Sequence, residues 1–136
     1  MAPSFRTRQP FRPPGRQRVY KVDSDVADTP PIGELEQLIL LAILRLGPDA
    51  YGLSVARELE AQAGRHLSRG ALYTSLDRLE AKGFLRWTLV AGGPERQSLP
   101  KRVYVVLPRG VSALRTSQRV LRRMWRGLDG ILKGQS

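Results

Sequence analysis

The chain has 136 residues, with 23 Lys+Arg against 12 Asp+Glu and a formal net charge of +11. Its length suits one compact domain with tails. The absence of cysteine and the single histidine exclude disulfides, thiolate metal sites and multi-histidine metal centres. No apolar run approaches the roughly 18 residues of a membrane span, and the N-terminus lacks a signal-peptide core, so we expect a cytoplasmic protein with no membrane partner.

The two ends of the chain carry most of the excess positive charge. Residues 1–31 hold six basic and three acidic residues, and residues 108–136 hold seven basic and one acidic residue. Such a field favours a polyanion, either nucleic acid or an acidic surface, although a merely soluble basic protein is the alternative. Residues 1–31 also hold six prolines and no apolar period, which predicts a disordered basic arm that either contacts phosphate or is inert.

Apolar residues at three- and four-residue steps predict three helices in the first half of the chain. The first covers residues 34–46 and stops at Gly47-Pro48, and the second covers residues 53–63 and stops at Gly64. Ser68 is a good N-cap for the third, over residues 69–82, and Gly83 is placed for a left-handed C-terminal cap.

Residues 84–90 and 101–107 are rich in β-branched and aromatic side chains, and they predict a hairpin with a polar loop over residues 91–100. Pro108 then opens a last helix, which we expect to reach about residue 132. The fold class is therefore mainly α with a small β-hairpin. Three helices followed by a hairpin is the order of a winged helix-turn-helix domain, here residues 32–107, followed by a C-terminal dimerisation helix over residues 108–136.

The third helix is the one that a helix-turn-helix lays in the major groove, with its first residues nearest the bases. Arg69 could contact guanine or phosphate, and Gly70 permits close approach of the helix backbone to DNA. The hydroxyls of Tyr73 and Thr74 can donate hydrogen bonds to phosphates. A solvated polar face is the alternative, and Tyr73 could instead pack on the second helix. The candidate DNA-binding residues on this helix are Ser68, Arg69, Gly70, Tyr73 and Thr74.

The hairpin supplies a second candidate contact, because a wing follows the phosphate backbone or enters the minor groove. Its basic residues are Arg96, Lys101 and Arg102. An ordinary charged loop is the alternative interpretation.

The last helix carries a heptad-like apolar seam with one polar break at Gln118. Because a chain this small leaves a long helix poorly covered, the seam favours pairing with a second copy. Packing on its own domain is the alternative. The candidate dimerisation residues are Leu114, Leu121, Trp125, Leu128 and Leu132.

The sequence offers no nucleophile–base arrangement, no glycine-rich phosphate loop and no metal-ligand spacing. We therefore expect no catalytic residue, no metal and no cofactor, and the protein is predicted not to be an enzyme.

Several segments resemble the PadR family of bacterial transcriptional regulators. They are GELEQLIL at 33–40, YGL at 51–53, GALYTSLDRLE at 70–80, KG at 82–83, KRVY at 101–104 and LPRG at 107–110. The resemblance implies a winged-helix DNA-binding domain and a C-terminal dimerisation helix. Members usually repress, and they often release DNA when a small molecule binds. Two departures are the basic arm and the short C-terminal region, which leaves no separate effector domain.

We therefore expect a transcriptional repressor that binds a palindromic operator in double-stranded DNA as a homodimer, through the third helix and the wing. In the smaller family members a small-molecule effector can bind at the dimer interface. Trp125 could line such a pocket, or be an ordinary packed tryptophan. The alternative function is a winged-helix interaction module whose basic termini bind an acidic partner or surface.

Overall fold

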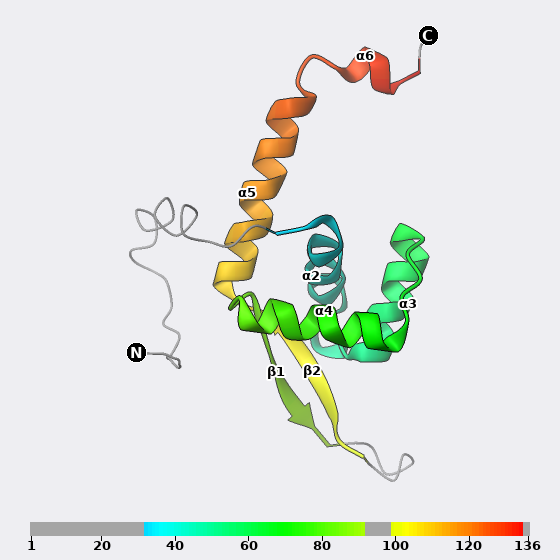
Figure 1. Ribbon diagram of the computed structural model, residues 1–136, viewed down its shortest axis with the longest axis vertical. Helices are drawn as coiled ribbons and strands as arrows, with labels where there is room; N and C mark the ends of the chain where they lie inside the picture. The colour runs from blue at the N-terminus through cyan, green and yellow to red at the C-terminus, as the bar shows by residue number, and fades with distance from the viewer. Residues whose placement is uncertain (1–31, 92–98, 135–136) are drawn as a thin grey trace.

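The computed structural model describes residues 32–91 and 99–134, so the predicted arm and Arg96 lie outside the described residues. Figure 1 shows a helical domain with one protruding hairpin and one long C-terminal helix. In chain order the elements are α2 (Glu34–Leu46), the short 3-10 helix η1 (Gly47–Asp49), α3 (Gly52–Ala63), α4 (Arg69–Ala81), β1 (Leu85–Val90), β2 (Lys101–Val106), α5 (Pro108–Trp125) and α6 (Asp129–Leu132).

The predicted bounds of the three helices before the hairpin are confirmed to within one residue, because local signals set them. The Ser68 hydroxyl accepts a hydrogen bond from the backbone N–H of Ala71 at 3.0 Å and so caps the start of α4. Gly83 follows α4 with φ 80°, a left-handed conformation that side chains other than glycine rarely adopt. Local sequence signals therefore determine both ends of α4, the helix expected from the sequence to contact DNA.

The hydrophobic core lies between the three helices and the inner face of the hairpin. The stripe predicted on α4 points into it, since Leu72, Leu76 and Leu79 are all buried. The largest fully buried side chains come from every element around the core and include Tyr104, Phe84, Ile39, Leu40, Leu76, Leu79, Leu85 and Val55. This shared core fixes α4 relative to the hairpin.

The hairpin is antiparallel, and its register pairs Trp87 with Tyr104 and Leu85 with Val106. A third short segment joins it, because the backbone N–H of Tyr104 donates to the carbonyl oxygen of Ala50 at 2.8 Å and Tyr51 forms a bridge with Val103. The β2 strand is therefore held on both edges, and the hairpin is attached to the turn between α2 and α3.

Tyr104 is 1% exposed, and its hydroxyl has no hydrogen-bond partner among the described residues. Burial raises the pKa of this phenol, and the neighbouring Arg102 partly opposes that rise. Because an unpaired hydroxyl contributes little net stability, Tyr104→Phe is expected to change the free energy of unfolding by less than about 1 kcal/mol. Tyr104→Ala, which leaves a cavity, is expected to cost about 3–5 kcal/mol. Urea unfolding measures the free energy of unfolding of both variants. A decrease of more than about 2 kcal/mol in Tyr104→Phe would show that the hydroxyl has a hydrogen-bond partner.

The first turns of α5 pack closely against the domain. A Cβ added at Gly110 would lie only 2.9 Å from Val106 Cγ1 and closer still to the carbonyl oxygen of Phe84, so glycine is required at this contact. Further along, the Ser117 hydroxyl donates to Gln37 Oε1 of α2 at 2.8 Å. These contacts set the direction in which the rest of α5 leaves the domain.

The prediction of one helix from Pro108 to residue 132 was wrong. The α5 helix ends at Trp125, Gly127 takes φ 83°, and a separate short α6 follows. A left-handed residue turns the chain, so the predicted seam is not one continuous stripe. Its first member also differs, because Leu114 is partly buried against the chain's own core. The C-terminal region 108–136 is thus two helices in its described part.

Candidate nucleic-acid interface

The start of α4 presents an open polar surface. Arg69, Gly70 and Thr74 are exposed, and a Cβ added at Gly70 would meet no atom within 4 Å. Ser68 is exposed as well, but its hydroxyl is engaged as the helix cap. Three predicted residues therefore lie together, free of side-chain crowding, where a helix-turn-helix contacts bases.

Tyr73 takes the packing position that sequence left open as an alternative. Its side chain is half-buried against the core, and a Cβ added at Gly52 would lie 2.8 Å from Tyr73 Cζ and closer to the hydroxyl. The ring thus lies against the first residue of α3. This contact joins the two helices of the helix-turn-helix and explains why Gly52 has no side chain, whereas a contact of Tyr73 with DNA stays a prediction.

Two predicted wing residues are stacked on aromatic rings. The Lys101 ammonium lies 3.7 Å from the centroid of the Tyr51 ring, and the Arg102 guanidinium lies 4.1 Å from that of Trp87. Each contact is a cation–π interaction, which fixes a long side chain without neutralising its charge. Both cations are therefore held at the loop end of the hairpin as oriented positive groups.

Sequence analysis missed the residue that joins the wing to α4. Trp87 Nε1 donates to Glu80 Oε1 at 3.2 Å, while the face of the same indole carries Arg102. Glu80 lies on α4, so the indole connects α4 to the hairpin. The available signal was the short turn at Gly83, which brings residues seven positions apart next to each other.

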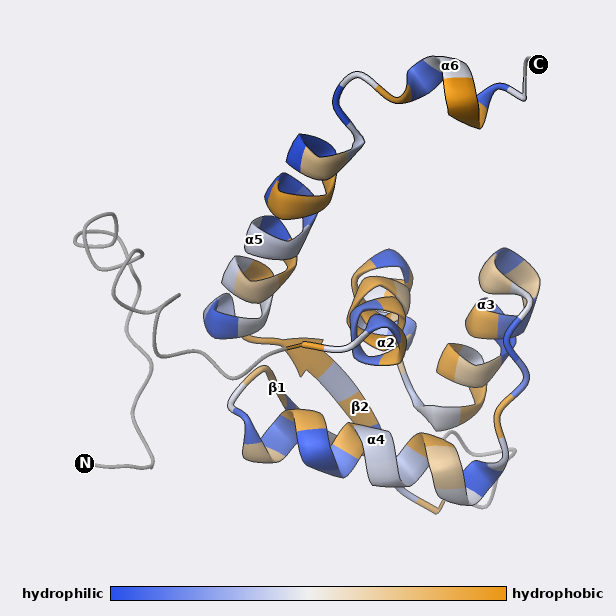
Figure 2. Cartoon of the chain, turned by 45° about the horizontal axis from the view of Figure 1, so that its top comes forward, coloured by the Kyte–Doolittle hydropathy of each residue, from blue (hydrophilic) through white to orange (hydrophobic). Residues whose placement is uncertain are grey.

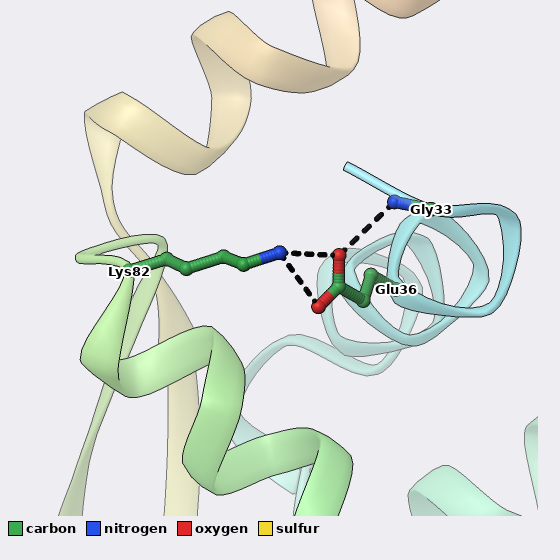
Figure 3. Close-up of polar contacts among 3 residues, drawn as sticks. All are labelled: Gly33, Glu36 and Lys82. Carbon is green, nitrogen blue, oxygen red and sulfur yellow. Dashed lines mark hydrogen bonds and ion pairs between the residues drawn. The ribbon is translucent and has the colours of Figure 1, made fainter. Parts of the chain in front are cut away.

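A buried ion pair, also missed from sequence, joins the start of α2 to the end of α4 (Figure 3). Lys82 Nζ donates to both carboxylate oxygens of Glu36, at 2.8 and 2.9 Å, and the backbone N–H of Gly33 donates to Glu36 Oε1 at 3.0 Å. Burial by itself raises the pKa of the Glu36 carboxyl, but the bonds from Lys82 and Gly33 outweigh it and leave the pKa below its usual value. The carboxylate is therefore ionised at neutral pH.

The outer part of α5 and all of α6 expose large apolar side chains. Figure 2 shows α5 with one apolar and one polar side. Four members of the predicted seam lie in this region and are exposed, namely Leu121, Trp125, Leu128 and Leu132, together with Val120, Met124 and Ile131. Several large apolar side chains exposed close together in the chain are typical of an interaction site.

The described residues contain no group of three or more His, Cys, Asp or Glu side chains that could hold a metal ion. Within the same ranges, no helix has the length and apolar character needed to cross a membrane.

The order of the elements, the capped α4 and the attached hairpin define a winged-helix domain in which the start of α4 is exposed. Comparison with known families agrees, because the transcriptional regulator PadR-like family matches residues 40–116, more than half of the chain. The chain belongs to this family. Its members are transcriptional regulators and not enzymes, so the prediction of a DNA-binding regulator is confirmed.

Solved structures show the same fold. A PadR-like transcription factor from Bacteroides fragilis has a TM-score of 0.57 and 24% identity, with 82% of this chain and 98% of that one covered. A PadR family regulator from Eggerthella lenta DSM 2243 has a TM-score of 0.53 and 24% identity, and the match covers 84% of this chain and 94% of that one. The complex structure of hsRosR-S4 has a TM-score of 0.53 and 24% identity, and the match covers 78% of this chain and 82% of that one. No curated protein matched the sequence.

Proposed function

We propose that the protein is a transcriptional repressor that binds a palindromic operator as a homodimer. The observation that carries the proposal is the start of α4, where Arg69, Gly70 and Thr74 are exposed together on a capped helix. A guanidinium can form two hydrogen bonds with the edge of guanine, a glycine lets the backbone approach, and a threonine hydroxyl can bond to phosphate. We assign base reading to Arg69 and positioning to Thr74.

The wing is assigned to the phosphate backbone. Lys101 and Arg102 are stacked at the loop end of the hairpin and keep their charge, which favours contacts that position the protein without reading sequence. Arg96 lies outside the described residues, and its contact with DNA stays a prediction, as does the role of the arm over residues 1–31. A DNA-binding role also implies a cytoplasmic location.

Base reading by Arg69 can be tested by two substitutions. Arg69→Ala is expected to weaken binding to the operator by about 1–3 kcal/mol while changing binding to a scrambled duplex much less. Arg69→Lys keeps the charge but loses the paired geometry, so it should retain scrambled-duplex binding and still lose operator affinity. Fluorescence anisotropy on both duplexes measures the difference. Equal losses on the two duplexes would make Arg69 a phosphate contact.

The operator itself can be found by selecting genomic fragments that the purified full-length protein binds. Enrichment of fragments that share a palindrome would support both the DNA-binding function and the two-fold symmetry. No enrichment over random fragments would favour the second function, a winged-helix interaction module that binds an acidic partner through its basic termini.

Relief of repression by a small-molecule effector completes the proposal. Trp125 is exposed among apolar neighbours on the surface assigned to the dimer interface, a setting suited to an apolar, aromatic ligand.

A further inference from the structure

Four arginines form a single line along α5. Arg115, Arg119, Arg122 and Arg126 are spaced at four, three and four residues, which places them within about 60° of one another around the helix. We call these four residues the arginine stripe. Ala113 and Ser117, which face the chain's own domain, lie on the opposite side of α5. The stripe therefore points away from the winged-helix domain.

The charge of the stripe is not compensated within the described residues. No acidic residue occurs between positions 108 and 126, and the side chains of the four arginines make no ion pair or hydrogen bond with any described residue. By contrast, Arg45 and Arg65 on the domain pair with Glu58 and Glu34. Like charges four residues apart destabilise a helix, so the stripe has a cost that a bound polyanion would offset.

The α5 helix, which carries the stripe, and the hairpin extend from the domain in opposite directions. Figures 1 and 2 both show α5 leaving the domain in the direction away from the tip of the hairpin. A duplex held by α4 and the wing lies at the hairpin end. The stripe therefore runs away from that segment of DNA and is available to another one.

We propose that the arginine stripe binds the phosphates of a second DNA duplex, so that the operator-bound protein bridges two DNA segments. The inference rests on the proposed function. Arg126 is the C-cap residue of α5 and follows Arg115 by eleven positions, a rise of about 16 Å, and one strand of B-DNA presents about five phosphates over that length at roughly 3.4 Å each. The four arginines, on average about 5 Å apart along the helix axis, therefore place positive charge beside several phosphates of a duplex.

An anionic membrane is the competing partner for a basic amphipathic helix. Membrane binding would insert the apolar side of α5, around Leu121 and Met124, into lipid. That side is the one assigned to the second copy of the chain. Dimerisation covers the apolar side of α5 and leaves the stripe exposed. In a dimer α5 therefore has no apolar side left to insert into lipid, and the stripe favours DNA over a membrane as its polyanionic partner.

A two-step capture assay tests the bridge. Beads carrying the selected operator duplex are loaded with full-length protein and washed, and bead occupancy is measured first. A fluorescent duplex without the operator is then added. The wild-type protein is expected to capture it, and the double variant Arg119→Gln/Arg122→Gln is expected to capture roughly fivefold less at equal occupancy, since counterion release scales with the phosphates contacted.

The matched control is Arg45→Gln/Arg65→Gln, which removes the same charge from α2 and from the segment after α3 and should capture as well as the wild type. Equal capture by the stripe variant and the wild type would overturn the proposal. So would occupied beads that capture no second duplex while the protein binds phosphatidylserine vesicles through the stripe. Beads left unoccupied by the wild type would instead overturn the proposed function.

Discussion

Replacing Glu36 with glutamine is expected to lower the free energy of unfolding by about 1.5–3 kcal/mol at pH 7, the usual value of hydrogen bonds to charged groups. Glu36 is 7% exposed and accepts three hydrogen bonds, two of them from Lys82. Glutamine keeps the shape and the bond from Gly33 but removes the charge that Lys82 faces. In a domain of this size the loss corresponds to a fall of roughly 10 °C or more in Tm, which differential scanning calorimetry measures.

Glu34→Gln is the matched control, because Glu34 lies in the same first turn and also faces a cation. Its side chain is 82% exposed and lies 3.5 Å from Arg65, so its loss is expected to cost under about 0.5 kcal/mol. Equal decreases in the free energy of unfolding for the two variants would show that burial of Glu36 does not strengthen its ion pair.

The same ion pair predicts how stability depends on pH. The folded-state pKa of Glu36 lies below its ordinary value of 4.5, so folding favours the ionised carboxylate. Its contribution is therefore fully present above about pH 4.5 and is lost as the pH falls through the lower folded value. The difference in unfolding free energy between the wild type and Glu36→Gln should shrink over that interval, which urea titrations at pH 3 to 7 would show.

Sequence predicted the helices of this fold well because their limits are encoded locally. A glycine with positive φ follows α2, α3 and α4, at Gly47, Gly64 and Gly83. The α4 start depends on the cap at Ser68, which is equally visible in sequence. The end of α5 was missed because apolar spacing continues past Gly127, and spacing records side-chain type and not the backbone conformation that turns the chain.

The contacts that position the candidate site could not be read from local patterns. Glu36 and Lys82 are 46 residues apart, and only the packed core brings them together. Tyr73 belongs to a turn of α4 that looks exposed by periodicity, yet the missing side chain at Gly52 gives its ring a place to pack. The stacking of Arg102 on Trp87 depends on the hairpin register, which turn-rich sequence between the strands does not specify.

A charge placed on the exposed apolar side of α5 is expected to convert a dimer into a monomer. Leu121 is 50% exposed beyond the part of α5 that packs on its own domain, with Met124, Trp125 and Leu128 exposed next to it. Leu41 and Leu44 of α2 are exposed as well, so a second copy has apolar surface to cover on two helices. Leu121→Glu would bury a carboxylate in that interface, which is strongly unfavourable, and sedimentation velocity should report a monomer.

Loss of the dimer should weaken operator binding far more than any single DNA contact. Two linked DNA-binding domains gain about 100-fold or more in affinity over one. Leu121→Glu is therefore expected to raise the operator Kd by at least that factor, while the circular dichroism spectrum stays unchanged. The control is Leu53→Glu, a leucine of α3 that is 56% exposed and lies outside α5. It should remain dimeric. A dimer that persists in Leu121→Glu would place the interface elsewhere, and a monomer that binds the operator with unchanged Kd would separate DNA recognition from dimerisation.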